Sequence, residues 1–436
     1  MQTKYKVTGL ISVVAFLLFL CFQLTDITTW EGPCLITALL AMAITAKGTE
    51  KFSGFSYSLM ILTAVAVSLY FPAPFVLVGS FQMKNLIVPL LQIIMFGMGS
   101  QMSLNDFAGV IKMPKGVLIG LCCQFTIMPI VGFIIIYIFN FPAEIAAGII
   151  LIGSSPSGMA SNVMSFIAKA NLALSVTITA CATLLAPFMT PLLMKLLVGH
   201  MVAIDFWGMM IGIFSMVILP ICAGLIFNMF MHRISMKQND QLQLLVLSGI
   251  ILLKNVISFL TAPMETNTLM INFGTDMALF AGLPIALATA LRYYQQNHQA
   301  IDLEKILSFI SMAGIGLIIT IITAAGRDSL LQVGQILILA CLLHNCMGYT
   351  LGYGLSRLFR LKEQDCRTIA LEVGMQNGGL ASGIAVELGK TATLGLAAAI
   401  FGSMMNVTGS SLASWWRRRS SELPKDKSEK IPAELI

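Results

Sequence analysis

Long apolar runs alternate with short polar segments along the whole chain. An apolar run of roughly 20 residues is long enough to cross a bilayer as an α-helix. The pattern predicts fourteen membrane spans, approximately at residues 7–24, 32–46, 56–78, 86–104, 116–139, 145–167, 171–197, 207–231, 242–262, 268–291, 306–325, 330–356, 368–388 and 391–416. The chain is therefore predicted to be an all-α, polytopic membrane protein with the lipid bilayer as its surroundings.

Lysine and arginine fall on alternate connections between these spans, as the positive-inside rule requires. If the N-terminus is cytoplasmic, the basic residues left on the outer side are Lys84, Lys195, Arg327 and Lys390. One span more or fewer would break this alternation, so we predict an even number of spans in the cell (inner) membrane, with the N- and C-termini cytoplasmic. The first run lacks a small-residue cleavage site, and we interpret it as a retained span rather than a signal peptide.

Composition agrees with this class, because 57% of the residues are hydrophobic and only 11% are charged. The formal net charge of +6 is scattered over short connections, which argues against a nucleic-acid partner. The nine cysteines form no CxxC motif. We predict that they are small buried hydrophobic residues rather than disulfides or ligands of a transition metal.

Glu372 is the least expected residue, because it lies inside a predicted span within the string LEVGMQNGGLASGI at 371–384. A carboxylate near the middle of a bilayer costs roughly 2.5–3.5 kcal/mol and needs a cation, a proton or a water-filled cavity. The nearby basic residues, Arg367 and Lys390, fall at the ends of that span. The pattern favours an ion-binding site over a buried structural ion pair.

Two predicted spans, the sixth and the thirteenth, are interrupted by glycine or proline. A lipid-facing helix would not tolerate such breaks, because the freed backbone groups would face hydrocarbon. Each break also carries hydroxyl or amide side chains, namely Ser161, Asn162, Gln376 and Asn377. Paired breaks in two halves of a chain indicate the binding site of a secondary transporter, whereas kinked packing helices are the alternative.

Counting supports two repeats. The interrupted helix is fourth of five in spans 3–7, and again fourth of five in span 8 with spans 11–14 if spans 9 and 10 are an inserted hairpin. An odd number of helices makes the repeats inverted, which predicts a ten-helix inverted-repeat core with four extra helices. The predicted parts are an N-terminal hairpin (1–52), the first repeat with the first helix of the second (53–236), an inserted hairpin (237–303), the rest of the second repeat (304–416) and a cytoplasmic tail (417–436).

Several strings in one order resemble the bile acid:sodium symporter family, including its bacterial members. They are IIMFGMG (93–99), QFTIMP (124–129), PAEIAAGIILIG (142–153), ASNVM (160–164), NLALSVTIT (171–179), LHNCMGY (343–349) and EVGMQNGGLA (372–381). The resemblance implies a panel domain and a core domain, with two broken helices that cross near the centre of the core.

The resemblance also implies two Na⁺ sites and a neighbouring substrate site. The first sodium site would use Ser161, Asn162, Ser175, Thr179 and Glu372. The second would use Gln124, Glu372, Gln376 and the backbone carbonyls of Val373 and Met375. The organic substrate would be bordered by Asn377, Ser157, Met159, Met405 and Asn406. Ser157 and Met159 stand where related bacterial sequences lead us to expect Gly and Thr, so the substrate need not be a bile acid.

The function predicted on these grounds is sodium-coupled symport of an organic anion, bile-acid-like or another carboxylate, by alternating access. Three alternatives remain: a proton in place of sodium at Glu372, a non-transporting receptor and an intramembrane enzyme. An enzyme is disfavoured because His200, His232, His298 and His344 are dispersed and no HExxH or GxSxG motif occurs. We predict that His344 is a hydrogen-bonded core residue.

The four extra helices are predicted to extend the panel or to form a homo-oligomer interface. In the inserted hairpin, Lys254 and Asp276 lie about equally far from the outer turn. Two charges 4 Å apart attract by about 4 kcal/mol at an effective dielectric constant near 20. The sequence therefore predicts an intramembrane ion pair between them.

Overall fold

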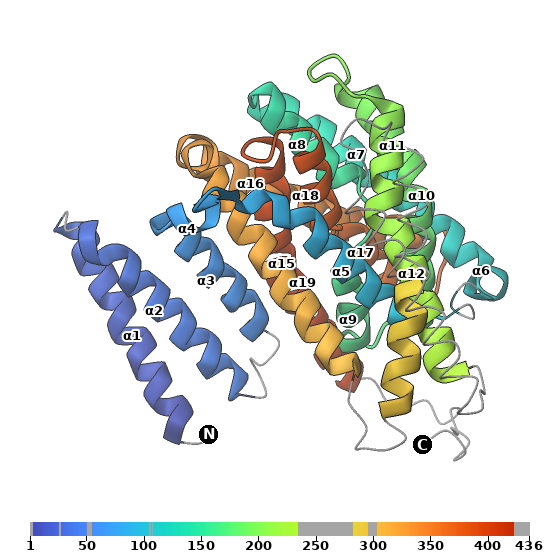
Figure 1. Ribbon diagram of the computed structural model, residues 1–436, viewed down its shortest axis with the longest axis horizontal. Helices are drawn as coiled ribbons and strands as arrows, with labels where there is room; N and C mark the ends of the chain where they lie inside the picture. Colours follow the sequence, from blue (N-terminus) through green and yellow to red (C-terminus); the bar gives the residue numbers. More distant parts are fainter. Residues whose placement is uncertain are drawn as a thin grey trace, which may run out of the picture.

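The computed structural model describes residues 3–25, 28–49, 55–103, 106, 108–233, 282–294 and 303–422. Almost all of them lie in α-helices (Figure 1). The predicted pair of Lys254 and Asp276 lies outside the described residues, as do most of the inserted hairpin and the end of the tail.

The helices follow the predicted spans in order. The uninterrupted ones are α1 (Thr3–Leu24), α2 (Thr28–Lys47), α3 (Ser56–Tyr70), α5 (Ile87–Gln101), α7 (Pro114–Phe139), α10 (Leu172–Val198), α15 (Leu303–Ala325), α16 (Arg327–Leu358) and α19 (Leu394–Glu422). The eighth span consists of α11 (Phe206–Ile213), the π-helical turn η4 (Phe214–Ile218), α12 (Leu219–Asn228) and a second π-helical turn, η5 (Met229–Arg233). A further helix covers 282–294, within and just beyond the predicted tenth span.

Both interrupted spans are broken where the sequence predicts. The sixth consists of α8 (Ala143–Ser154) and α9 (Met159–Ile167), and the thirteenth of α17 (Glu363–Gly374) and α18 (Gly378–Glu387). In the described part of the chain, nine helices are long and apolar enough to cross a membrane. With α3 and the two interrupted spans, these correspond to twelve of the fourteen predicted spans.

The predicted third span is too long. We expected a helix over 56–78, but α3 ends at Tyr70 because Pro72 follows. The chain then forms the short helix α4 (Ala73–Val76) and a hairpin of β1 (Leu77–Val78) and β2 (Phe81–Gln82), in which Val78 pairs with Phe81. Gly79 in its turn has a φ of +60°, a conformation that glycine adopts without strain. The short 3₁₀-helix η2 (Met83–Leu86) leads into α5, and the short helix α6 (Gly109–Lys112) leads into α7.

The backbone around the two interrupted spans repeats itself. Helices α8 and α17 each have 12 residues. A residue with positive φ precedes each of them by three positions, Asn140 before α8 and Arg360 before α17. Another follows each second half by two positions, Lys169 after α9 and Gly389 after α18. Both pairs are 220 residues apart along the chain. This supports two repeats, and their inverted relation stays a prediction.

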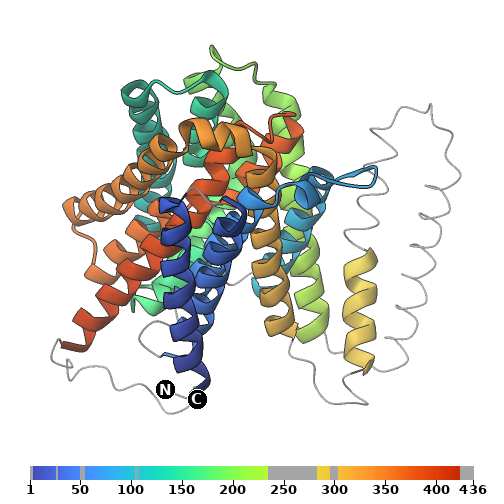
Figure 2. The same cartoon turned by 90° about the vertical axis from the view of Figure 1, so that its left-hand side faces the viewer.

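The helices form two groups. In one, α1, α2, α3, α15, α5 and α12 contact one another in that spatial order. In the other, α7, α8, α10, α16, α17 and α19 pack around the interrupted spans, which lie toward the middle of the molecule (Figure 1). Seen from its own side in Figure 2, the hairpin of α1 and α2 lies in front of the rest. The hairpin therefore extends the first group at its edge.

All nine cysteines are free, but only Cys123, Cys341 and Cys366 are buried. The prediction of burial is wrong for four of them, Cys21, Cys122, Cys222 and Cys346, which are exposed. These four lie on outward faces of membrane helices. An apolar sequence run does not distinguish such a face from the protein interior, because lipid is apolar too.

Candidate functional site

The site begins where the two interrupted spans cross. The Asn377 amide donates to the Pro156 carbonyl at 2.8 Å, and the Gly158 amide donates to the Met375 carbonyl at 3.1 Å. Ser157 and Gln376 thereby form an isolated antiparallel β-bridge. Each break thus supplies hydrogen-bond partners for the other, which hydrocarbon could not do.

Glu372 lies at this crossing, in the last turn of α17, and is fully buried. The hydroxyl groups of Ser161 and Ser175 donate to its Oε1 at 2.7 and 2.5 Å. Those of Ser157 and Thr179 donate to Oε2 at 2.6 and 2.8 Å. Each carboxylate oxygen therefore has two hydroxyl donors, and every donor is a neutral group.

Asn162 completes the first predicted ion site. Its Oδ1 lies 2.8 Å from Ser175 Oγ and 3.2 Å from Thr179 Oγ1. Ser175 and Thr179 share one face of α10 because they are four residues apart. The structure thus brings together all five residues of this site, from α9, α10 and α17.

No basic side chain pairs with Glu372 in the described part of the chain. The two candidates from the sequence bind other carboxylates: Arg367 Nε lies 2.9 Å from Glu363 Oε1, and Lys390 pairs with Glu144. Neither of them forms the structural ion pair that was the alternative for Glu372. Among the described residues, the partners of the Glu372 carboxylate are neutral hydroxyl groups.

The second predicted ion site lies beside the first. Gln124 Nε2 donates to Gln376 Oε1 at 2.7 Å, and Gln376 Nε2 donates to the Val373 carbonyl at 2.6 Å. Gln124 is fully buried, yet its Oε1 has no hydrogen-bond partner. A buried acceptor without a donor is costly, and a bound cation would satisfy it. The side chains and carbonyls present therefore fit a hard cation.

A cavity of about 90 Å³ adjoins the crossing. Four of the five predicted substrate residues line it, namely Met159, Asn377, Met405 and Asn406. Ser157 does not, because its hydroxyl is bound to Glu372. The structure thus groups Ser157 with the predicted sodium ligands.

Sequence reasoning missed the residues that hold the end of α17. Asn345 Nδ2 donates to the Gly374 carbonyl at 2.7 Å, and Thr408 Oγ1 donates to Asn345 Oδ1 at 2.5 Å. Tyr349 OH lies 3.3 Å from Thr408 Oγ1. Polar residues at four-residue spacing on an apolar helix, Asn345 and Tyr349, were the available signal.

His344 is a hydrogen-bonded core residue, as predicted. It is fully buried, and its Nε2 lies 2.8 Å from the Met128 carbonyl oxygen, to which it donates. The ring also packs edge-on against Phe401, with 5.5 Å between ring centroids. His344 thus has a packing role beside the crossing.

Each interrupted span is also tied to the segment that follows the other. Asn171 Nδ2, before α10, donates to Asp365 Oδ1 at the start of α17, at 2.8 Å. Correspondingly, Lys390 and Thr393, before α19, both donate to Glu144 at the start of α8. These two hydrogen bonds lower the pKa of Glu144, Lys390 having the larger effect. These contacts hold the first turns of α8 and α17 against the segments before α19 and α10.

Comparison with known proteins decides the family. A sequence profile of the Sodium Bile acid symporter family matches residues 88–264. Over 370 residues the chain is 31% identical to the "Uncharacterized sodium-dependent transporter YocS" of Bacillus subtilis (strain 168), which covers 85% of this chain and 93% of that protein. The chain belongs to the sodium bile acid symporter family.

A second relative in this family is a "Probable sodium/metabolite cotransporter BASS1, chloroplastic" of Arabidopsis thaliana. It is 30% identical over 336 residues, or 77% of this chain and 68% of that protein. The relatives are named as transporters and not as enzymes. Together with the apolar helices, membership in this family makes the chain an integral membrane protein of a sodium-dependent transporter family.

Proposed function

We propose that this protein is a secondary active symporter that uses the entry of Na⁺ to carry a small organic anion by alternating access. The observation that carries the proposal is Glu372, a fully buried carboxylate that has four neutral hydroxyl donors and, within the described ranges, no basic partner in an ion pair. Neutral oxygens with one carboxylate suit a hard monovalent cation, because they supply ligands without excess charge.

Two Na⁺ ions would share Glu372. The first would be held by Ser161, Asn162, Ser175, Thr179 and Glu372, and the second by Gln124, Gln376, Glu372 and the carbonyls of Val373 and Met375. The unpartnered Oε1 of Gln124 supports the second site. Because both ions would share one carboxylate, neither would attract the other. Binding of one Na⁺ would therefore raise the affinity for the second only by ordering residues that both sites use.

The driving force is sufficient for accumulation. If two Na⁺ enter with one monovalent anion, one net charge crosses, which is worth about 2.3 kcal/mol at roughly 100 mV. Two tenfold sodium gradients add about 2.7 kcal/mol at roughly 1.36 kcal/mol per decade. The total of roughly 5 kcal/mol would support accumulation of a few thousandfold.

The anion would occupy the cavity beside the crossing. Met159 and Gly378, the first residues of α9 and α18, both line that cavity. Helix N-termini favour negative charge because the helix dipole has its positive end there. In α18 the backbone amides of Gly378 and Leu380 already donate to the Gln376 carbonyl and to Asn377 Oδ1, so the attraction there is that of the dipole. The amide side chains of Asn377 and Asn406 would orient a carboxylate, and Met159 and Met405 would contact its apolar part.

A thermal-shift screen of organic anions on the purified protein, in NaCl and in choline chloride at fixed pH, tests the proposal. Sodium at a hundredfold excess over its Kd would stabilise the protein by about 2.7 kcal/mol. We expect Na⁺ to raise Tm and a transported anion to raise it further only with Na⁺ present.

Glu372→Gln is expected to abolish both shifts. Glu363→Gln, on the same helix and partly exposed, is the matched control and should keep them. An equal Na⁺ shift in Glu372→Gln would overturn the assignment. Shifts that follow pH but not Na⁺ would favour proton coupling, and ligand binding without flux into vesicles would favour a receptor.

A further inference from the structure

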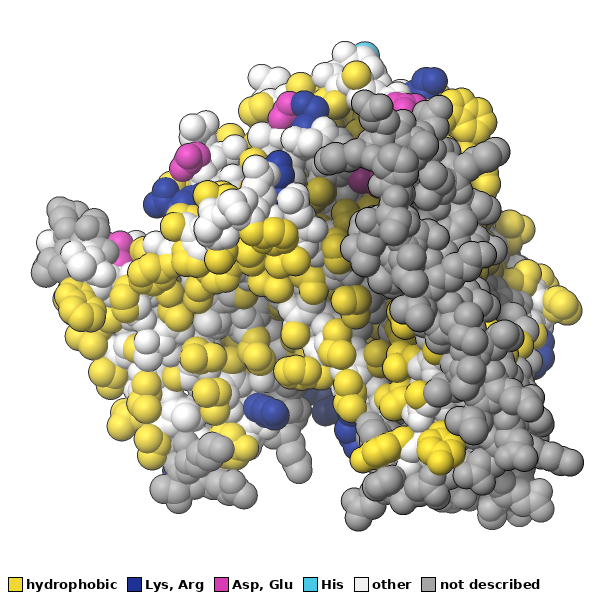
Figure 3. Space-filling model, viewed as in Figure 1, with side chains coloured by type: hydrophobic (Ala, Val, Ile, Leu, Met, Phe, Trp, Pro, Cys, Tyr) yellow, Lys and Arg dark blue, Asp and Glu magenta, His cyan; other side chains and the backbone are white. Residues whose placement is uncertain are grey.

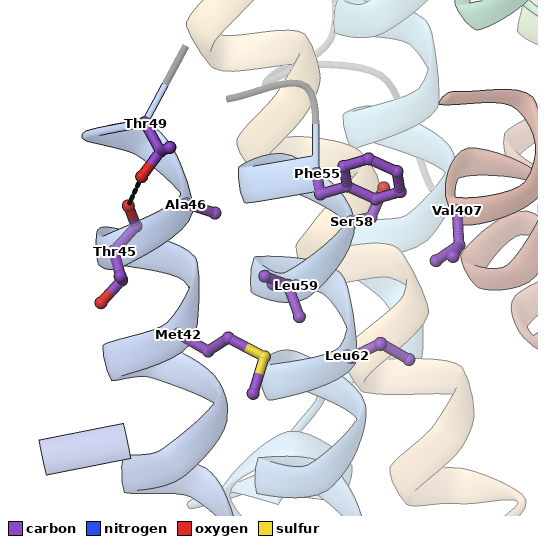
Figure 4. A pocket seen from close by; sticks show the side chains of 9 residues that line it. All are labelled: Met42, Thr45, Ala46, Thr49, Phe55, Ser58, Leu59, Leu62 and Val407. Carbon is purple, nitrogen blue, oxygen red and sulfur yellow. Dashed lines mark hydrogen bonds between the residues drawn. The ribbon is translucent and has the colours of Figure 1, made fainter. Parts of the chain in front are cut away.

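A second cavity, of about 370 Å³, lies away from the crossing, between α2, the beginning of α3 and α19 (Figure 4). Helix α2 lines it with Met42, Thr45 and Ala46, and Thr49 just after α2 also lines it. The chain at the start of α3 lines it from Phe55 to Leu62. Val407 of α19 forms the opposite wall. The cavity thus separates the extra hairpin and α3 from a helix of the other group.

Its walls are apolar apart from three hydroxyl groups. Thr45 donates to the Ala41 carbonyl at 2.8 Å and lies 2.9 Å from Thr8, and Thr49 donates to the Thr45 carbonyl at 3.2 Å (Figure 4). Ser58 is 2% exposed, and its Oγ has no hydrogen-bond partner. A buried water needs two to four polar partners, and this cavity offers one free hydroxyl. Its lining therefore suits a mostly apolar ligand that has a single hydrogen-bond acceptor.

The cavity opens toward the hydrocarbon of the bilayer. Met42 lines it and is 42% exposed, and Leu59 and Leu62, which also line it, are partly exposed. Helix α1, which packs on α2, carries many more exposed hydrophobic side chains, and hydrophobic side chains dominate this part of the surface in Figure 3. Acyl chains are therefore the molecules in contact with its mouth.

We propose that this cavity binds one acyl chain of a membrane glycerophospholipid, with an ester carbonyl of the lipid accepting a hydrogen bond from Ser58. Ser58 lies in the first turn of α3, at the beginning of that predicted span, where it would meet the ester groups of one leaflet. Beyond Leu62 another cavity, of about 620 Å³, continues along α3 to Leu69. From Ser58 to Leu69 the path is about 16 Å at 1.5 Å per residue, close to half of the roughly 30 Å hydrocarbon core.

The proposed lipid would contact the helix that forms part of the substrate cavity. Val407 directly follows Met405 and Asn406 in α19, and these two residues line the cavity at the crossing. A bound acyl chain therefore fills the space between α3 and α19. It stabilises the conformation in which this cavity separates the two helices.

Photolabelling tests the proposal. The full chain is reconstituted in vesicles of phosphatidylcholine that carries a diazirine in one acyl chain, irradiated and mapped by peptide mass spectrometry. We expect adducts at Leu59, Leu62 and Val407 to be several-fold more frequent than at Leu10 and Leu17, which face outward on α1.

Two variants give the decisive comparison. Ala46→Phe fills the cavity and should lower labelling of Leu59 and Leu62 several-fold, whereas Ile44→Phe, outward-facing on the same helix, should not. Ser58→Ala should also lower it, and this change removes no hydrogen bond on which the fold depends. Labelling of α3 that is unchanged in Ser58→Ala and Ala46→Phe, or no higher than that of α1, would overturn the proposal.

Discussion

At the scale of single residues, Glu372 is surrounded in a way that leaves its charge without compensation. Each oxygen of its carboxylate accepts two hydrogen bonds, from the hydroxyl groups of Ser157, Ser161, Ser175 and Thr179. These hydroxyl groups contribute no positive charge. Burying a charge without an opposite one is unfavourable even when it is hydrogen-bonded. The carboxylate therefore needs a cation or a proton to balance it, and the proposed sodium sites would supply the cation.

Two serines of α9 allow a matched test. Ser161 and Ser165 are both fully buried, but the Ser161 hydroxyl donates to Glu372 and the Ser165 hydroxyl has no hydrogen-bond partner. A hydrogen bond to a charged group is worth about 1.5–3 kcal/mol, and each 1.4 kcal/mol is about tenfold in affinity. We expect Ser161→Ala to weaken Na⁺ binding by roughly tenfold or more in a sodium titration of Tm, and Ser165→Ala to leave it unchanged. Equal effects of the two changes would contradict the role of Ser161.

At the scale of elements, the crossing brings two kinds of helix end close together. The carbonyl ends of α8 and α17 meet near Glu372, whereas the first residues of α9 and α18 border the neighbouring cavity. Carbonyl ends attract cations and amide ends attract anions. In the proposed mechanism, one pair of broken helices would therefore provide adjoining places for sodium and for an organic anion.

The contact between Glu144 and Lys390, which ties α8 to the segment before α19, should make stability depend on pH. The pKa of Glu144 is lowered by the hydrogen bonds from Lys390 and Thr393. Its contribution is present above the unfolded pKa, about 4.3, and is lost as pH falls through the lower folded value. We expect Glu144→Gln to lower Tm at neutral pH and to match the wild type in strong acid. A Tm difference that persists unchanged in acid, or effects of Glu144→Gln and Lys390→Met that simply add, would rule out this coupling.

At the scale of the whole molecule, the extra hairpin is peripheral. Helix α1 packs mainly on α2, and α2 on α3, while the crossing is formed by helices of the other group. Removing residues 1–52 also removes two spans and so leaves the predicted orientation of the rest unchanged. We expect the truncated chain to keep the Na⁺-dependent rise in Tm. Loss of that rise in a truncated protein that still unfolds cooperatively would show that the hairpin acts on the site.

Much of this arrangement follows from the sequence, since lipid imposes strict requirements on backbone and charge. Breaks at Pro156 and Gly378, and a carboxylate at 372, have few explanations inside a bilayer, and they led to two paired broken spans with an ion site. The crossing of these spans came from the family resemblance. The position of Ser157 against Glu372 did not follow, because it depends on how two distant segments pair. Nor did the contact of Asn345 with Gly374, since a polar residue on an apolar helix does not reveal its partner.

Binding of radioactive Na⁺ to the purified chain at fixed pH measures whether Glu372 holds sodium. We predict saturable binding of two Na⁺ per chain by the wild type and by Glu363→Gln, and no saturable binding by Glu372→Gln. Undiminished Na⁺ binding in a folded Glu372→Gln variant would contradict the account.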